Sequence, residues 1–180
     1  TTKDEFRYQQ RGYAKYGDIA RLFGWQALKN FFKQENLDFN AGTLTCFEEA
    51  VCRDGLAQVD SRILRLSKGA GTDLTPLIHF WGIHPDNSTA LAQAITVAGL
   101  SSSTIIRDKL IYYAGIAPTN NAQFNTHFET VFPGRPEGGH PDYGVGWYNV
   151  WRDSFNESHG AQIKTTVQSL LSQYFPGTNL

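Results

Sequence analysis

The sequence predicts an all-α protein, an irregular helical bundle of about seven or eight helices with one long loop rich in glycine and proline. Apolar residues recur at spacings of three and four along most of the chain, and clusters of glycine, proline and serine separate these segments. No stretch shows the sustained alternation of apolar and polar residues that a half-buried strand requires. A chain of 180 residues is long enough to bury a core of its own.

Residues 71–82 are the segment around which the other helices are expected to pack, because this segment is almost wholly apolar. Asp73 can cap a helix here by accepting from backbone N–H groups two or three residues on, and Pro76 falls in the first turn. Gly82 can take the left-handed conformation that ends a helix. A helix so apolar has to be surrounded by amphipathic neighbours. Its expected inward face consists of Leu74, Leu77, Ile78 and Trp81.

The N-terminal part predicts two helices. Residues 4–23 have helical spacing that Gly12 and Gly17 are expected to weaken, and Gly24 ends this segment. Residues 36–50 have no sustained period and are predicted to form a loop. The second helix is expected at residues 25–33, with Trp25, Leu28, Phe31 and Phe32 directed inward.

The rest of the chain predicts further helices divided by a long loop. Eight prolines and glycines make regular structure unfavourable within residues 132–146. We expect residues 1–84 to form one helical subdomain and residues 85–180 a C-terminal helical extension packed on it. The additional helices are predicted at residues 54–68, 90–98, 104–114, 122–131 and 148–174.

The charge balance gives no sign of a nucleic-acid or membrane partner. Sixteen basic residues face 17 acidic ones, the net charge is −1, and no block of one sign occurs. The apolar runs are too short for a membrane-spanning helix, and the N-terminus lacks the pattern of a signal peptide. The chain has no methionine even at position 1, which favours a processed product or an excised piece of a longer protein.

The two cysteines and five histidines provide little evidence for a metal site. Cys46 and Cys52 could form a small-loop disulfide in an oxidising compartment or remain two buried thiols, and the spacing leaves both open. No histidine lies in a His-Glu-x-x-His pattern. His79 and His84 are five residues apart with Gly82 between them, so they are not expected to share a helical face. We therefore predict no metal ligand in this chain.

A candidate ligand-binding site lies at the end of the long loop. Trp147 and Tyr148 could stack on a sugar or a peptide, and His140 and Asp142 could orient that ligand by hydrogen bonding. The alternative is that the two rings anchor the start of the last helix to the core.

Three segments resemble parts of the enhancin-like metallopeptidases, a secreted family that includes bacterial mucin and O-glycoprotein peptidases. Residues 16–32 contain the run Phe-Gly-Trp-Gln-Ala-Leu, similar to an aromatic-Gly-Trp-x-Ala-hydrophobic helix pair downstream of the family's zinc site. Residues 60–67, Gly-Thr-Asp-Leu-Thr-Pro at 71–76 and Phe-Trp-Gly-Ile at 80–83 resemble the family's Ser-x-x-x-Gly-x-Asp-Leu-x-Pro … Trp-Gly ending. The remainder, through Tyr-Phe-Pro-Gly at 174–177, is similar to the C-terminal extension of immunomodulating metalloproteases.

The resemblance implies a part of an enzyme and no complete active site. In that family a His-Glu-x-x-His helix and a later glutamate bind zinc, and this chain has neither, so no catalytic residue can be carried over. The implied function is the C-terminal helical portion of a secreted zinc metallopeptidase acting on glycosylated proteins. It would form a cleft wall and structural support, and would be catalytically silent alone. Zinc and the partner segment would lie upstream in the same polypeptide, and the substrates would be O-glycosylated proteins.

Two other functions fit the same residues. The chain could be an autonomous helical module that binds glycans or peptides, or a structural scaffold within a larger assembly.

Overall fold

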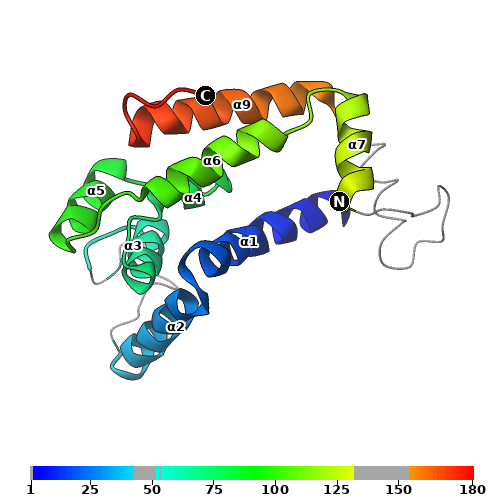
Figure 1. Ribbon diagram of the computed structural model, residues 1–180. Helices are drawn as coiled ribbons and strands as arrows, with labels where there is room; N and C mark the ends of the chain where they lie inside the picture. Colours follow the sequence, from blue (N-terminus) through cyan, green and yellow to red (C-terminus); the bar gives the residue numbers. More distant parts are fainter. Residues whose placement is uncertain (1, 43–51, 53, 132–154) are drawn as a thin grey trace. The chain divides into compact units, whose positions relative to one another are not determined.

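The computed structural model describes residues 2–42, 52, 54–131 and 155–180, and within these ranges the chain is helical without a strand (Figure 1). This confirms the predicted all-α class. The eight helices of the described ranges are α1 (Thr2–Phe23), α2 (Trp25–Asn40), α3 (Gln58–Ala70), α4 (Thr75–Phe80), α5 (Ser88–Val97), α6 (Thr104–Ile116), α7 (Asn121–Val131) and α9 (Glu157–Tyr174).

Helix α4 lies in the segment expected to be central, and it forms for the reasons its sequence gives. The Asp73 Oδ1 atom accepts from the Thr75 N–H at 2.9 Å, and Pro76 lies in the first turn. Gly82 has a φ of 84°, which places it in the left-handed region. Four residues of this segment were predicted to point inward, and three of them, Leu74, Leu77 and Ile78, have only 0–1% of their surface exposed.

Trp81 departs from that prediction because it is only half-buried. Its indole Nε1–H donates to the Asp18 Oδ2 atom at 2.9 Å, and Asp18 itself is buried. An indole usually needs such a partner when part of it leaves water. Trp81 therefore joins α1 to the end of α4 through a polar contact as well as through packing.

The first two helices are longer and more regular than predicted. Helix α1 continues through Gly12 and Gly17 without a break, and the weakening expected at these glycines stays a prediction. Helix α2 continues to Asn40, into the stretch predicted as loop. The extension is supported by polar pairs one turn apart: Gln34 donates to Asp38 at 2.8 Å, and Asn40 donates to Asn36 at 2.9 Å.

Helix α2 packs closely on α3 at Gly69. A Cβ atom at Gly69 would lie 2.7 Å from the carbonyl oxygen of Ala27, so only glycine fits without a shift of the backbone. The Asn30 side chain donates to the Gly69 carbonyl oxygen at 3.3 Å. The buried apolar residues contributed by α1, α2, α3 and α5 are Ile19, Ala20, Ala27, Leu28, Phe31, Ile63, Leu64, Leu66, Leu91 and Ile95.

A buried carboxylate connects α3 to the start of α5. Asp60 has no exposed surface, and its two oxygens accept from the backbone N–H groups of Asp86 at 2.9 Å and Asn87 at 2.8 Å. Asn87 in turn caps α5 by accepting from the Ala90 N–H. Asp60 thus fixes the turn between α4 and α5 from a distant part of the chain.

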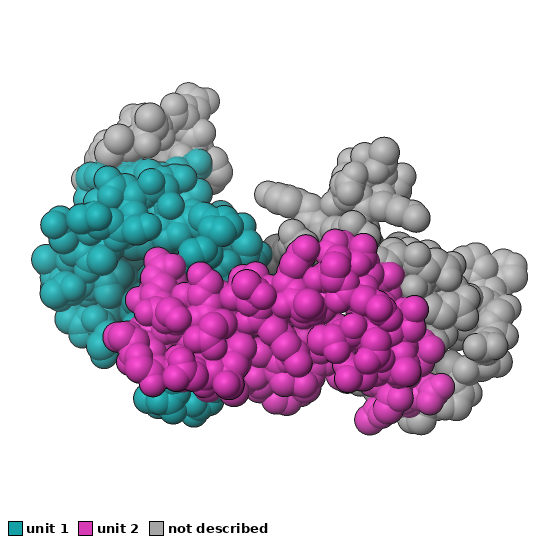
Figure 2. Space-filling model, turned by 90° about the horizontal axis from the view of Figure 1, so that it is seen from above, with its two compact units in different colours: residues 1–108 teal, residues 109–180 magenta. Residues whose placement is uncertain are grey.

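The chain divides into two compact units, Thr1–Asp108 and Lys109–Leu180, coloured separately in Figure 2. The boundary falls within α6. In the second unit Gly160 of α9 lies directly against the Pro118 carbonyl, and Val167, Leu170 and Leu171 are buried. The functional division expected after residue 84 stays a prediction.

Candidate interaction surface

The site predicted from the sequence lies outside the described residues. His140, Asp142, Trp147 and Tyr148 all belong to it, so its proposed role in ligand binding stays a prediction.

The cysteine pair is described at one of its two positions. Cys52 is buried and disulfide-bonded, whereas Cys46, the only other cysteine in the sequence, lies outside the described residues. The Cys52 N–H donates to the Leu56 carbonyl oxygen at 2.7 Å, which fixes this cysteine next to the start of α3. The pairing of Cys46 with Cys52 stays a prediction.

The structure brings together two histidines that were not expected to share a helical face. The rings of His79 and His84 meet edge to face with their centroids 4.4 Å apart. Helix α4 ends before His84, so the two rings meet across the turn at Gly82 and not along a helical face. The pKa of His79 is lowered, first by burial and second by the charge of His84.

Among the described residues of the first unit, a row of exposed aromatic rings lies along α2. Trp25, Phe32 and Phe39 are 70%, 54% and 65% exposed, and a spacing of seven residues places them on one side of the helix. Lys29 and Asn36, also exposed, fall between them. We call these five residues, Trp25, Lys29, Phe32, Asn36 and Phe39, the α2 stripe.

The prediction that Trp25 and Phe32 point inward was therefore wrong. Helix α2 buries Ala27, Leu28 and Phe31 instead. The Phe32 ring contacts the buried Phe31 ring edge to face, with their centroids 5.0 Å apart. The contact restricts the Phe32 ring, although about half of its surface remains exposed. An aromatic ring held in this way loses little conformational freedom when a partner covers it.

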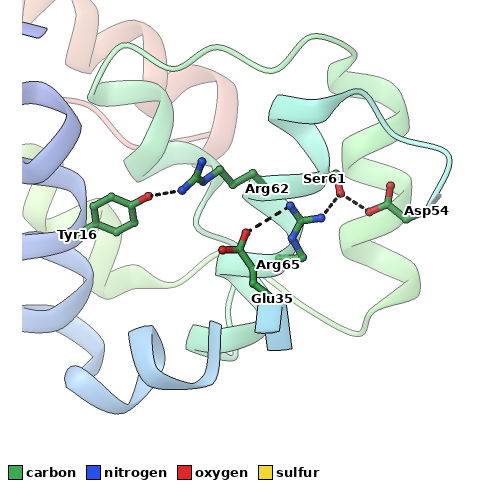
Figure 3. A network of polar contacts seen from close by, with 6 residues as sticks. All are labelled: Tyr16, Glu35, Asp54, Ser61, Arg62 and Arg65. Carbon is green, nitrogen blue, oxygen red and sulfur yellow. Dashed lines mark hydrogen bonds and ion pairs between the residues drawn. The ribbon is translucent and has the colours of Figure 1, made fainter. Parts of the chain in front are cut away.

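Polar contacts along one border of the stripe hold α2 to α3. Figure 3 shows Arg65 between two partners: its Nη2 atom lies 3.5 Å from the Glu35 carboxylate, and its Nη1 donates to the Ser61 hydroxyl at 2.6 Å. The Ser61 hydroxyl donates to the Asp54 carboxylate at 2.6 Å. Arg65 and Glu35 are mostly covered, with side chains 14% and 21% exposed, which strengthens the pair relative to a surface one.

The charges along α2 are divided between its two sides. Glu35 is engaged with Arg65, and Asp38 accepts from Gln34. Lys29 and Lys33 lie on the exposed side, and within the described residues neither forms an ion pair. The open side of α2 thus combines aromatic rings with uncompensated positive charge.

The signal for this surface is present in the sequence. The five residues of the stripe follow one another at spacings of four, three, four and three, which places them in one row along a helix with an aromatic ring at every second place. Leu28 and Phe31 provide a second apolar face on the same helix, and only packing shows which of the two faces is covered.

The described ranges contain neither a membrane-spanning helix nor a cluster of metal ligands. There, no helix is long and apolar enough to cross a membrane. In the same part of the chain, no three or more His, Cys, Asp or Glu side chains are grouped so that they could hold a metal ion.

Comparison with known proteins identifies no relative, since no protein-family model, curated protein or solved structure matches the chain. The resemblance to enhancin-like metallopeptidases, with the secreted location, zinc-bearing partner segment and glycoprotein substrates that it implies, therefore stays a prediction from the quoted motifs.

Proposed function

We propose that this chain is a helical binding module that docks an acidic amphipathic helix along the α2 stripe. The observation that carries the proposal is the row of three exposed rings at heptad spacing on a helix whose other face is already covered. Amphipathic helices dock through anchors that recur at this spacing. This function belongs to the peptide-binding class that the sequence left open beside the peptidase fragment.

The charge of the stripe supports an acidic partner. Lys29 lies within the stripe and Lys33 borders it. Glu35, which lies at the other border, is already paired with Arg65, and Asp38 accepts from Gln34. A partner helix that places glutamate or aspartate opposite these lysines would compensate them, and a basic partner would be repelled.

A second copy of this chain fits the stripe less well. Parallel pairing of two α2 helices would set Lys29 opposite its own copy, because equivalent seam positions meet across a parallel pair. Antiparallel pairing centred on Phe32 would bring Lys33 close to its copy at the border. Like charges therefore oppose self-association in either direction.

An anionic membrane surface is the other occupant to be excluded by experiment. Interfacial helices present a broad apolar face to lipid. The α2 stripe is one residue wide between Gln26, Asn30 and Lys33 on one side and the covered face on the other. This narrow shape favours a helix over a bilayer.

The proposal can be tested with a synthetic peptide of about three heptads, with leucine at its seam positions and glutamate at its flanking positions. Titration followed by fluorescence anisotropy should give saturable binding. Phe32→Ser should weaken it about tenfold or more, since a central aromatic anchor contributes at least ~1.4 kcal/mol. Leu37→Ser is the matched control, because Leu37 is 52% exposed on α2 but lies off the stripe.

Charge reversal provides a second, independent arm. The double substitution Lys29→Glu and Lys33→Glu should reverse the preference, so that a peptide with lysine in place of glutamate binds better than the acidic one. Equal losses in Phe32→Ser and Leu37→Ser, or equal binding of both peptides by the unsubstituted chain, would contradict the proposal. Uptake by phosphatidylserine vesicles without peptide binding would assign the stripe to a membrane instead.

A further inference from the structure

Two positive side chains from different helices of the first unit contact the same tyrosine, Tyr16. Lys15 of α1 is buried, with 8% of its surface exposed, and Arg62 of α3 is exposed. Between them is Tyr16, whose hydroxyl oxygen accepts from the Arg62 Nη2 atom at 3.0 Å (Figure 3).

Neither cation has an acidic partner within the described residues. The Lys15 ammonium lies 4.7 Å from the centroid of the Tyr16 ring, and the Arg62 guanidinium lies 6.0 Å from that of Phe31. Arg65, one turn further along α3, provides the contrast because it is paired with Glu35. Aromatic faces compensate a positive charge only in part.

The environment of Lys15 is electrostatically unfavourable for its charged form. Its pKa is lowered, first by burial and second by the positive charge of Arg62. Two cations brought together without a carboxylate repel each other, so a bound anion would relieve both the repulsion and the loss of solvation.

We propose that Lys15, Arg62 and the Tyr16 hydroxyl form a binding site for a tetrahedral oxyanion, a phosphate or sulfate group. All three side chains offer donors: the ammonium has three, the guanidinium keeps N–H groups beyond the one given to Tyr16, and the phenol that accepts from Arg62 still has its own O–H. Arginine and lysine together form charge-assisted hydrogen bonds to such groups. Three donors on separate side chains suit a tetrahedral ligand better than a planar carboxylate.

The site is tested by titrating the full chain with inorganic phosphate, sulfate, O-phosphoserine and acetate at constant ionic strength, followed by backbone amide NMR shifts. Phosphate or sulfate should saturate shifts around residues 15, 16 and 62, and acetate should bind at least tenfold more weakly. Tighter binding of O-phosphoserine than of inorganic phosphate would assign the site to an ester-linked phosphate, whereas equal binding would assign it to the free ion.

Substitutions separate this site from general attraction of anions. Lys15→Met and Arg62→Gln should each weaken phosphate binding about tenfold or more, and Tyr16→Phe should weaken it severalfold. Lys68→Gln is the matched control, because Lys68 is an exposed lysine on the same helix as Arg62. Equal binding by Lys15→Met and the unsubstituted chain, or the absence of saturable shifts, would overturn the proposal.

A second readout does not depend on affinity. Bound phosphate favours the charged ammonium, so the pKa of Lys15, followed through its side-chain carbon signals, should rise when phosphate is added. An unchanged pKa at saturating phosphate would show that the anion does not contact Lys15 and would overturn the assignment.

Discussion

Asp60 is a charged residue with no exposed surface, and two backbone N–H groups before α5 hold its carboxylate. Each oxygen has one donor at hydrogen-bonding distance, so neither is left unsatisfied. Hydrogen bonds to a charged group each contribute about 1.5–3 kcal/mol, more than neutral ones. The position of the turn that starts α5 therefore depends on a single side chain of α3.

Replacing Asp60 by asparagine should lower the free energy of unfolding by about 2–4 kcal/mol. The amide keeps one acceptor, but its NH2 group would face the other backbone N–H, so one bond is lost and a buried donor is left unpaired. Urea denaturation measures this decrease in the free energy of unfolding. Asp86→Asn, the same substitution at an exposed neighbour, should change stability by no more than about 0.5 kcal/mol. Equally small effects at both positions would contradict the role given to Asp60.

The His79–His84 pair predicts an unusual titration. Because burial comes first among the causes that lower the His79 pKa and the charge of His84 second, His84→Gln should raise the His79 pKa only part of the way toward 6.5. Proton NMR titration of the imidazole signals measures the His79 pKa in the unsubstituted chain and in the variant. Full restoration to 6.5 would mean that burial contributes little.

The sign of the stability effect follows from the same shift. Between the lowered His79 pKa and 6.5, the unfolded chain binds more protons than the folded one. Stability should therefore decrease as the pH falls through that window. The decrease should be smaller in His84→Gln.

At the scale of elements, the contact between α2 and α3 positions the stripe. Gly69 allows the two backbones to approach, and Asn30 and Arg65 fix the contact at either side. A helix attached in this way presents its uncovered face as a rigid surface, which reduces the ordering cost of binding.

Gly69→Ala should therefore destabilise the fold by roughly 1–3 kcal/mol, although alanine is the better helix former. Gly17→Ala is the matched control: Gly17 is also helical, and a Cβ atom there would meet nothing within 4 Å. That substitution should stabilise the fold by about 0.5–1 kcal/mol. Thermal denaturation measures the stability of both variants. A higher melting temperature in both would show that α2 and α3 are not closely packed at Gly69.

At the scale of the whole molecule, we expect no stoichiometric zinc. The sequence lacks a His-Glu-x-x-His pattern, and the two histidines that meet in the structure offer only two ligands where a zinc site needs three or four. Elemental analysis after dialysis measures the amount of zinc bound per chain. One tightly held zinc ion per chain would refute this prediction and place a metal centre within the chain.

Sequence patterns were sufficient for the helical class and for most helix positions. The start and end of α4 followed from Asp73, Pro76 and Gly82, because capping depends on neighbours in the chain. The extension of α2 was missed since its support comes from polar pairs one turn apart, which a search for apolar periodicity does not detect.

The candidate surface could be predicted only in part. The sequence by itself determined that α2 has two faces able to pack, one with Leu28 and Phe31 and one with Trp25, Phe32 and Phe39, because helical spacing is a local property. Only the tertiary structure decided which face is covered. The Gly69 contact and the Arg65–Glu35 pair bring α3 to the first face. The contact of Arg62 with Tyr16, beside Lys15, was decided in the same way, because it depends on how distant segments pack.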